Sequence, residues 1–205
     1  MTKIKQIVTG TIAENCYVIY QDKTALIVDP GADFSKIMNA IEELQVMPVA
    51  ILLTHCHYDH IGALEETRTT YNIPVYVSPL EKDWPMNPTL NLSQSLLKPI
   101  IAQPAEYEFE TMEDYNFDGI ELRVVPTPGH SPGGVSFIFS DFVITGDALF
   151  KNGVGRSDLP FSNSKDLLKG IKEQLFTLAD KMLIYPGHGE KSTIGQEKLS
   201  NPFFN

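Results

Sequence analysis

Three of the chain's five histidines fall in one short stretch, HCHYDH at residues 55–60, directly after an apolar run that reads as a buried strand. Side chains alternate along an extended segment, so His55 and His57 should point to the same side. Asp59 and His60 fall where the chain turns into a helix, and they can reach a neighbouring point. Because imidazoles and carboxylates are good ligands for zinc, iron and manganese, the stretch predicts a metal site.

The second half of the chain places its remaining histidines in the same way. His130 ends the run VVPTPGH, His188 ends LIYPGH, and Asp147 follows the strand-like run FVITG. A lone His or Asp after a strand is more often an ordinary core or surface residue, but the four segments together offer seven candidate ligands. One tetrahedral ion needs only four. We therefore predict two divalent ions about 3.5–4 Å apart, zinc first, with iron or manganese as alternatives.

Alternating short strands and helices should position these residues. Strands are expected at 4–10, 15–21, 24–31, 49–55, 73–78, 120–130, 134–140, 142–150 and 181–189, where β-branched and aromatic residues are punctuated by Gly, Asp and Pro. Helices are expected at 34–44, 59–71, 164–179 and 193–199, with Ser164 as an N-cap.

Residues 80–107 lose this periodicity, and four prolines interrupt them. We expect an excursion with little regular structure, a kind of segment that often serves as a binding loop or lid. No linker separates two parts of the sequence, so a single domain over residues 1–205 is expected.

The composition limits the function classes. The formal net charge of −10 disfavours nucleic acid and anionic membranes as partners, although a small substrate is still compatible with it. No apolar run approaches the ~20 residues that span a bilayer. The two cysteines form no disulfide framework, so we expect a cytoplasmic protein with Cys16 and Cys56 buried and inert. The sequence predicts no oligomeric state.

A set of motifs carries a family resemblance: ENCYVI, VDPG, HCHYDH, TPGHSPGGV, GDALF, GVGRSDLP and PGHG. Over essentially the whole chain this set resembles the metallo-β-lactamase-fold hydrolases, and within them the glyoxalase II-like branch. The resemblance implies an α/β fold built as a four-layer αββα sandwich. In such a fold two mixed β-sheets face each other, helices lie outside, and the metals bind at one edge.

The resemblance also implies a role for each candidate ligand. The first ion would be held by His55, His57 and His130, the second by Asp59, His60 and His188, and Asp147 would bridge them.

Two further residues enter through the resemblance. Asp29 of VDPG would lie close to the site, as a hydrogen-bond partner of a ligand or as a turn former. Arg156 of GVGRSDLP would take the place of a basic substrate contact, with a solvated loop residue as the alternative. Asp158 stands where the branch has a tyrosine, and only a short tail follows His188 where larger glutathione thioesterases carry a helical region. These departures weaken the expectation of glutathione recognition.

The chemistry expected of this site is hydrolysis of a thioester or activated ester. Two divalent ions lower the pKa of water, and Asp59 could orient the attacking water as the catalytic carboxylate. A thiol with a pKa near 8.5 can leave as thiolate without a strong general acid, whereas the amine of an amide cannot. The expected activity is therefore similar to that of hydroxyacylglutathione hydrolase, with a small-molecule substrate.

An oxidoreductase on the same scaffold is the alternative. It would resemble persulfide dioxygenase and hold one iron through His55, His130 and Asp147, a triad of two histidines and one carboxylate. The two hypotheses differ in metal stoichiometry and in whether oxygen is consumed. A nuclease is disfavoured by the acidic charge, and a non-catalytic binding module by the complete ligand set.

Overall fold

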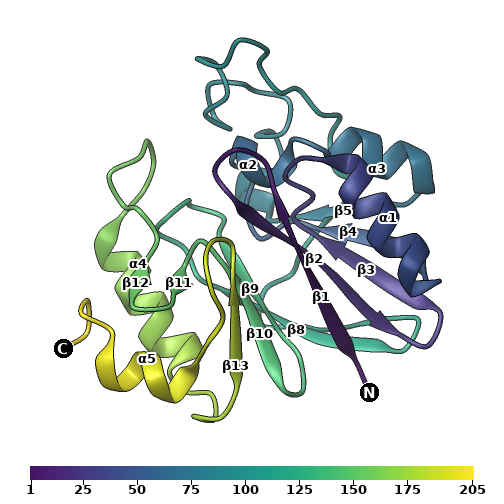
Figure 1. The fold of residues 1–205 in the computed structure, drawn as a ribbon. Coiled ribbons are helices and arrows are strands. Elements are labelled where there is room, and N and C mark those ends of the chain that lie inside the picture. The colour runs from purple at the N-terminus through teal and green to yellow at the C-terminus, as the bar shows by residue number, and fades with distance from the viewer. The chain divides into compact units, whose positions relative to one another are not determined.

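The computed structural model describes residues 1–205, and the chain divides into two compact units (Figure 1). The first unit comprises Met1–Phe109 and Asn116–Glu121, and the second comprises Glu110–Tyr115 and Leu122–Asn205. The expectation of one domain over the whole chain stays a prediction.

A six-stranded mixed sheet forms the frame of the first unit. In sheet order its strands are β1 (Lys3–Thr9), β2 (Glu14–Gln21), β3 (Thr24–Val28), β4 (Met47–Leu52), β5 (Val75–Val77) and β6 (Tyr107–Glu108). The first three strands pair antiparallel, and β3 to β6 pair parallel. The end of β4 is buried, as expected of a strand in the parallel part of a sheet.

Two helices cover one face of this sheet (Figure 1). Helix α1 (Phe34–Leu44) has the predicted bounds, and it packs Ile37 and Ile41 into the core of the unit. The helix predicted at 59–71 is divided into α2 (Tyr58–Ile61) and α3 (Leu64–Tyr71).

The predicted irregular excursion is largely confirmed. Between β5 and β6 the only regular element is the short 3₁₀-helix η1 (Pro79–Glu81), and turns fill the rest. The segment is nevertheless packed into the unit, because Trp84 and Ala102 belong to its buried hydrophobic cluster.

The second sheet is also mixed and six-stranded. In sheet order its strands are β14 (Ser192–Thr193), β13 (Leu183–Pro186), β10 (Phe142–Gly146), β9 (Val135–Ile138), β8 (Ile120–Pro126) and β7 (Asp114–Phe117). A small ribbon of β11 (Leu149–Phe150) and β12 (Gly153–Val154) follows β10. Strands β10 and β13 pair parallel, while the pairs β8–β9, β9–β10 and β13–β14 are antiparallel.

The helices of the second unit differ in detail from the prediction. The helix expected at 164–179 ends earlier, as α4 (Ser164–Gly170) followed by a π-helical turn, η2 (Ile171–Leu175). The break follows a glycine, which stabilises a helix interior poorly. The N-cap prediction was wrong by one residue: the side chain of Asn163, not Ser164, accepts the N–H groups of the first turn. Helix α5 (Ile194–Ser200) closes the chain, close to the predicted 193–199.

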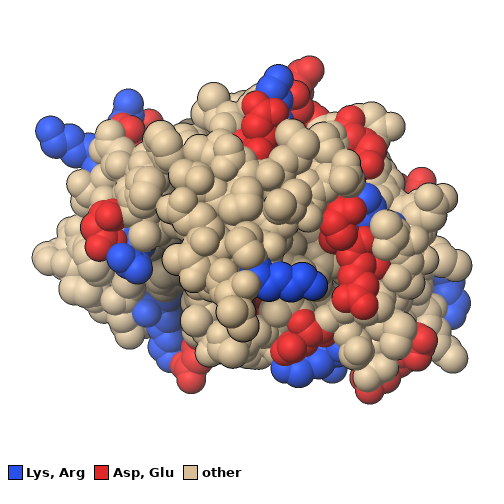
Figure 2. All heavy atoms as spheres, turned by 90° about the horizontal axis from the view of Figure 1, so that it is seen from above, with Lys and Arg blue, Asp and Glu red and all other residues tan.

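On the face shown in Figure 2, Lys and Arg side chains lie singly or beside Asp and Glu, and they do not gather into one basic patch.

Candidate ligands follow the ends of parallel strands in this architecture. In the second unit, β10 ends at Gly146 opposite Pro186 of β13, so Asp147 and His188 emerge from the same edge of the sheet. In the first unit, the stretch 55–60 follows β4 by two residues. The strands thus fix where each ligand leaves the backbone.

Gly31 permits a close approach between the loop after β3 and the start of α2. A Cβ atom at this position would lie 2.0 Å from the carbonyl oxygen of Asp59 and 2.3 Å from Oε2 of Glu14. No side chain fits there unless the backbone moves.

We therefore predict that Gly31→Ala destabilises the fold by about 1–3 kcal/mol through overpacking. Urea unfolding measures this change. The matched control is Gly153→Ala, because a Cβ there would meet nothing closer than 3.8 Å. That variant should stay within about 0.5 kcal/mol of the parent chain. Equal stability of the two variants would show that the contact at Gly31 relaxes freely.

Candidate metal centre

The first unit brings the four candidate ligands of the HCHYDH stretch together. The ring centroids of His55 and His57 are 4.7 Å apart, and those of His55 and His60 are 4.1 Å apart. Oδ2 of Asp59 lies 3.5 Å from Nε2 of His60. Two ligands on one tetrahedral ion, each about 2.05 Å from it, are about 3.3 Å apart. The spacing of Asp59 and His60 therefore suits ligands of a single ion.

Asp29 hydrogen-bonds to His60 directly and to His55 through Thr54. It is buried and accepts both the N–H and the hydroxyl of Thr54, at 2.7 and 2.6 Å. Its Oδ2 also lies 3.0 Å from Nδ1 of His60. A carboxylate only accepts hydrogen bonds, so Nδ1 of His60 carries the proton and Nε2 keeps a lone pair for a metal.

His55 is oriented by the same network. The hydroxyl of Thr54 donates to Asp29, so its oxygen accepts from Nδ1 of His55, 3.1 Å away. One potential metal-coordinating atom from each of Asp29, His55 and His60 lies within 4.8 Å of the other two. Because the oxygens of Asp29 already accept three hydrogen bonds, we interpret it as the residue that orients the ligands, not as a ligand.

The second unit brings together His130, Asp147 and His188. Oδ2 of Asp147 lies 3.4 Å from Nε2 of His130 and 3.7 Å from Nε2 of His188. Nδ1 of His130 lies 2.8 Å from the carbonyl oxygen of Arg156, so it carries the proton and leaves Nε2 as the ligand atom. One carboxylate oxygen beside two imidazoles is the arrangement expected of a bridging ligand.

The side chain of Arg156 has a partner of its own. Its Nε and Nη2 donate to the two carboxylate oxygens of Asp158, at 2.9 and 3.0 Å. The hydrogen bonds from Arg156 lower the pKa of Asp158 and raise that of Arg156. The structure thus gives Arg156 a backbone role towards His130, while the predicted substrate contact stays a prediction.

Cys56 is buried, as predicted. Desolvation raises the pKa of its thiol well above the usual range, and the nearby charge of Glu81 raises it further. Both effects disfavour the thiolate form of Cys56.

Two buried carboxylates close to the HCHYDH stretch were not singled out from the sequence. Glu81 accepts the N–H of Cys56 at 2.7 Å. Glu14 accepts the hydroxyl of Thr9 at 2.6 Å and lies 3.9 Å from Nδ1 of His60. Burial raises the pKa of Glu14 well above its usual range, and the nearby His60 acts in the opposite direction. The motif ENCYVI contains Glu14, but its letters do not reveal that the side chain is buried.

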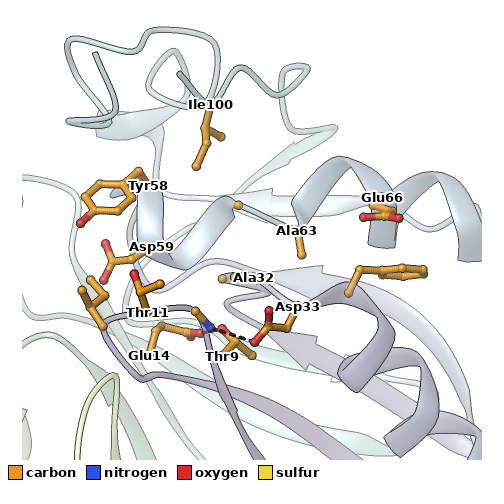
Figure 3. A pocket seen from close by; sticks show the side chains of 15 residues that line it. Thr9, Thr11, Glu14, Ala32, Asp33, Tyr58, Asp59, Ala63, Glu66 and Ile100 are labelled. Atoms are coloured by element: carbon orange, nitrogen blue, oxygen red, sulfur yellow. Dashed lines mark hydrogen bonds between the residues drawn. The ribbon is translucent and has the colours of Figure 1, made fainter. Parts of the chain in front are cut away.

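A cavity of about 410 Å³ adjoins Asp59 within the first unit. In Figure 3, Tyr58, Asp59, Thr11 and Glu14 lie towards one end of the cavity, and Glu66 lies towards the other. The cavity thus lies directly beside Asp59, the predicted catalytic carboxylate.

The donor set fits divalent first-row ions. Every candidate ligand is an imidazole or a carboxylate. The Nδ1 atoms of His55, His60 and His130 already have hydrogen-bond partners, which leaves their Nε2 atoms for a metal. Imidazoles with one nitrogen fixed and the other directed inward are typical of metal sites.

Comparison with known proteins agrees with this geometry. The sequence profile described as the Metallo-beta-lactamase superfamily matches residues 9–188, which includes all seven candidate ligands. The chain belongs to the metallo-β-lactamase superfamily. The predicted family and fold are thereby confirmed, and the two mixed sheets are those of this superfamily.

Two curated relatives of the superfamily illustrate its range. The probable metallo-hydrolase M6_Spy0554 of Streptococcus pyogenes is 44% identical, over 100% of this chain and 91% of its own length. The hydroxyacylglutathione hydrolase GloC of Haemophilus influenzae is 34% identical, over 94% of this chain and 93% of its own. The chain is accordingly a metal-dependent hydrolase of this superfamily, and its His/Asp cluster indicates divalent metals.

Two solved structures are similarly close. The BLEG-1 B3 metallo-beta-lactamase has a TM-score of 0.95 and 39% identity, covering 99% of this chain and 100% of its own. TTHA1623 in a di-iron-bound form has a TM-score of 0.83 and 33% identity, covering 97% of this chain and 99% of its own.

In this chain, every helix is too short or too polar to cross a bilayer.

The network behind the imidazoles generates a prediction. Asp29→Asn should weaken zinc binding about 10–100-fold, because an amide cannot accept the three hydrogen bonds that orient His60 and Thr54. Competition with a chromogenic chelator measures the affinity.

Asp22→Asn is the matched control. Asp22 is an exposed residue with φ 52°, close to the φ of 50° at Asp29, so both substitutions keep a residue that tolerates this backbone. Its zinc affinity should equal that of the parent chain. Parental affinity in Asp29→Asn would remove Asp29 from the metal centre.

Proposed function

We propose that this chain hydrolyses a thioester at a centre that holds two divalent metal ions, zinc in the first place. The observation that carries the proposal is Oδ2 of Asp147, which lies beside the Nε2 atoms of both His130 and His188. A carboxylate oxygen shared in this way suits two ions better than one. The likeness to GloC supports thioester chemistry, and the likeness to TTHA1623 in its di-iron form supports two ions.

The proposed ligands are the seven residues predicted from the sequence. His55, His57 and His130 would hold the first ion, Asp59, His60 and His188 the second, and Asp147 both.

When bound, two such ions make water acidic enough to ionise near neutral pH and polarise the substrate carbonyl. The chain's own residues supply the orientation. Asp59 accepts a hydrogen bond from the attacking water and directs its lone pair to the carbonyl carbon. The buried Asp29 keeps His60 in the tautomer whose Nε2 is unprotonated. The departing thiolate needs no proton from the protein, because thiols ionise near pH 8.5.

Hydrolysis of a β-lactam is the second candidate, favoured by the 39% identity to the BLEG-1 B3 metallo-beta-lactamase. Opening a lactam expels an amine nitrogen, which needs a proton as it leaves. The sequence offers no defensible proton donor outside the proposed ligands, so we rank this reaction below thioester hydrolysis.

Metal analysis combined with turnover tests the proposal. We expect about two ions per chain after reconstitution with zinc, and release of thiol from S-lactoylglutathione that stops when a chelator removes the metal. His57→Ala should lower kcat/KM by more than about 100-fold while the circular dichroism spectrum is unchanged, since even residues that only orient ligands contribute about 10–100-fold.

Other outcomes would redirect the assignment. Hydrolysis of nitrocefin without thioester turnover would favour the β-lactam reaction. One iron per chain with consumption of oxygen would favour the dioxygenase. Near-normal turnover by folded His57→Ala would remove that residue from the mechanism.

Arg156 is the proposed contact for an anionic substrate, and Asp158 competes for it. Asp158→Asn should raise kcat/KM for S-lactoylglutathione about two- to five-fold, and the rise should diminish at high salt. Arg156→Gln should lower kcat/KM. Both residues are exposed, so neither change should unfold the chain.

Asp180→Asn provides the control, because it removes a comparable ion pair with Lys198 at 2.7 Å. Its kinetics should match those of the parent chain. Parental kinetics in Asp158→Asn and Arg156→Gln would show that Arg156 is a solvated loop residue.

A further inference from the structure

The segment between β5 and β6 is attached to the HCHYDH stretch at three consecutive residues. The carboxylate of Glu81 accepts the N–H of Cys56 at 2.7 Å. The ring of Trp84 lies against that of His57, with centroids 5.7 Å apart and a tilt of 34°. The N–H of Tyr58 donates to the carbonyl oxygen of Asn91 at 2.8 Å.

Asn91 also holds the segment together internally. Its side-chain amide donates to the carbonyl oxygens of Trp84, Pro85 and Ile100, at 3.2, 3.4 and 3.1 Å. Ser93 accepts the N–H of Ile100 at 2.9 Å. Asn91 and Ser93 are both fully buried, so opening the segment would expose several satisfied polar groups at once.

Glu81 is the least expected member of this set. Its side chain is completely buried, and burying a carboxylate is unfavourable unless specific partners compensate for the lost hydration. The partner given above is the backbone N–H of Cys56, the single residue between His55 and His57. A hydrogen bond at that point fixes the extended backbone from which both imidazoles project.

We propose that Glu81 is a positioning residue for the metal centre, which it serves by anchoring the backbone between His55 and His57. The segment between β5 and β6 then braces the backbone of the HCHYDH stretch. This inference depends on the proposed metal centre but not on the identity of the substrate.

Glu106 offers a control of the same chemistry in the same segment. Its Oε2 accepts the N–H of Val75 at 2.8 Å, and its Oε1 lies 3.2 Å from Nη1 of Arg68. It therefore ties the segment to the sheet through a carboxylate and a backbone N–H, without touching the HCHYDH stretch.

The experiment compares Glu81→Met with Glu106→Met, because methionine has a similar length but no oxygen that accepts the backbone N–H. Three measurements are made on folded protein: zinc affinity by chelator competition, the visible absorption spectrum of the cobalt(II)-substituted protein, and steady-state kinetics that give kcat and KM separately. Glu81→Met should weaken zinc binding about 10–100-fold, change the cobalt spectrum and lower kcat more than KM changes. Glu106→Met should lose thermal stability while its zinc affinity and cobalt spectrum stay parental.

Parental zinc affinity and an unchanged cobalt spectrum in Glu81→Met would overturn the proposal, as would equal losses in the two variants. If Glu81→Met does not fold, Glu81→Asp replaces it, because it keeps the charge but shortens the reach. That variant should show the same spectral change, and a parental spectrum would again overturn the proposal.

Failure of the proposed function gives a different result. A parent chain that binds zinc but hydrolyses no thioester would refute the function, and the comparison of metal affinities would still decide the role of Glu81.

Discussion

Hydrogen bonds to the outward Nδ1 atoms of the histidines are the interactions on which the rest of the structure depends. An imidazole can serve as a ligand through either nitrogen, and it can rotate about two side-chain bonds. Asp29 fixes Nδ1 of His60, the Thr54 hydroxyl fixes that of His55, and the Arg156 carbonyl fixes that of His130. Each of these partners comes from a different loop, so three separate backbone paths must be accurately placed. Asp29 and Thr54 follow the buried strands β3 and β4, which are each paired on both sides and therefore have little freedom to shift.

The candidate ligand residues could be singled out in the sequence because their types and spacing are unusual. A cluster of three histidines and an aspartate within 55–60 has no packing advantage, and strand periodicity locates its backbone. The bounds of α1 were equally accessible, since its apolar spacing is regular. The orientation of His130 was not, because a backbone carbonyl such as that of Arg156 leaves no mark on residue identity. Glu81 was missed because it lies where periodicity fades, and a buried carboxylate there is indistinguishable from a solvated one.

The comparisons do not single out one substrate class. The likeness extends to proteins named as a hydroxyacylglutathione hydrolase and as a β-lactamase, at 34% and 39% identity. A fold shared at this level constrains the ligands far more than the loops around them. Outside the candidate ligand set, this chain has an ion pair between Arg156 and Asp158 and a cavity beside Asp59.

The ribbon of β11 and β12 connects two candidate ligands, Asp147 and His130. It follows Asp147, and the chain returns so closely that the N–H of Gly155 donates to the carbonyl oxygen of Ala148 at 3.1 Å. A Cβ on Gly155 would lie 1.8 Å from the carbonyl oxygen of Asp147. The next residue, Arg156, orients His130. The hydrogen bond between Ala148 and Gly155 therefore ties the backbone after Asp147 to the backbone before Arg156, whose carbonyl oxygen holds His130. A displacement of His130 should thus be transmitted to Asp147, so substitutions between Asp147 and Arg156 should be strongly non-additive.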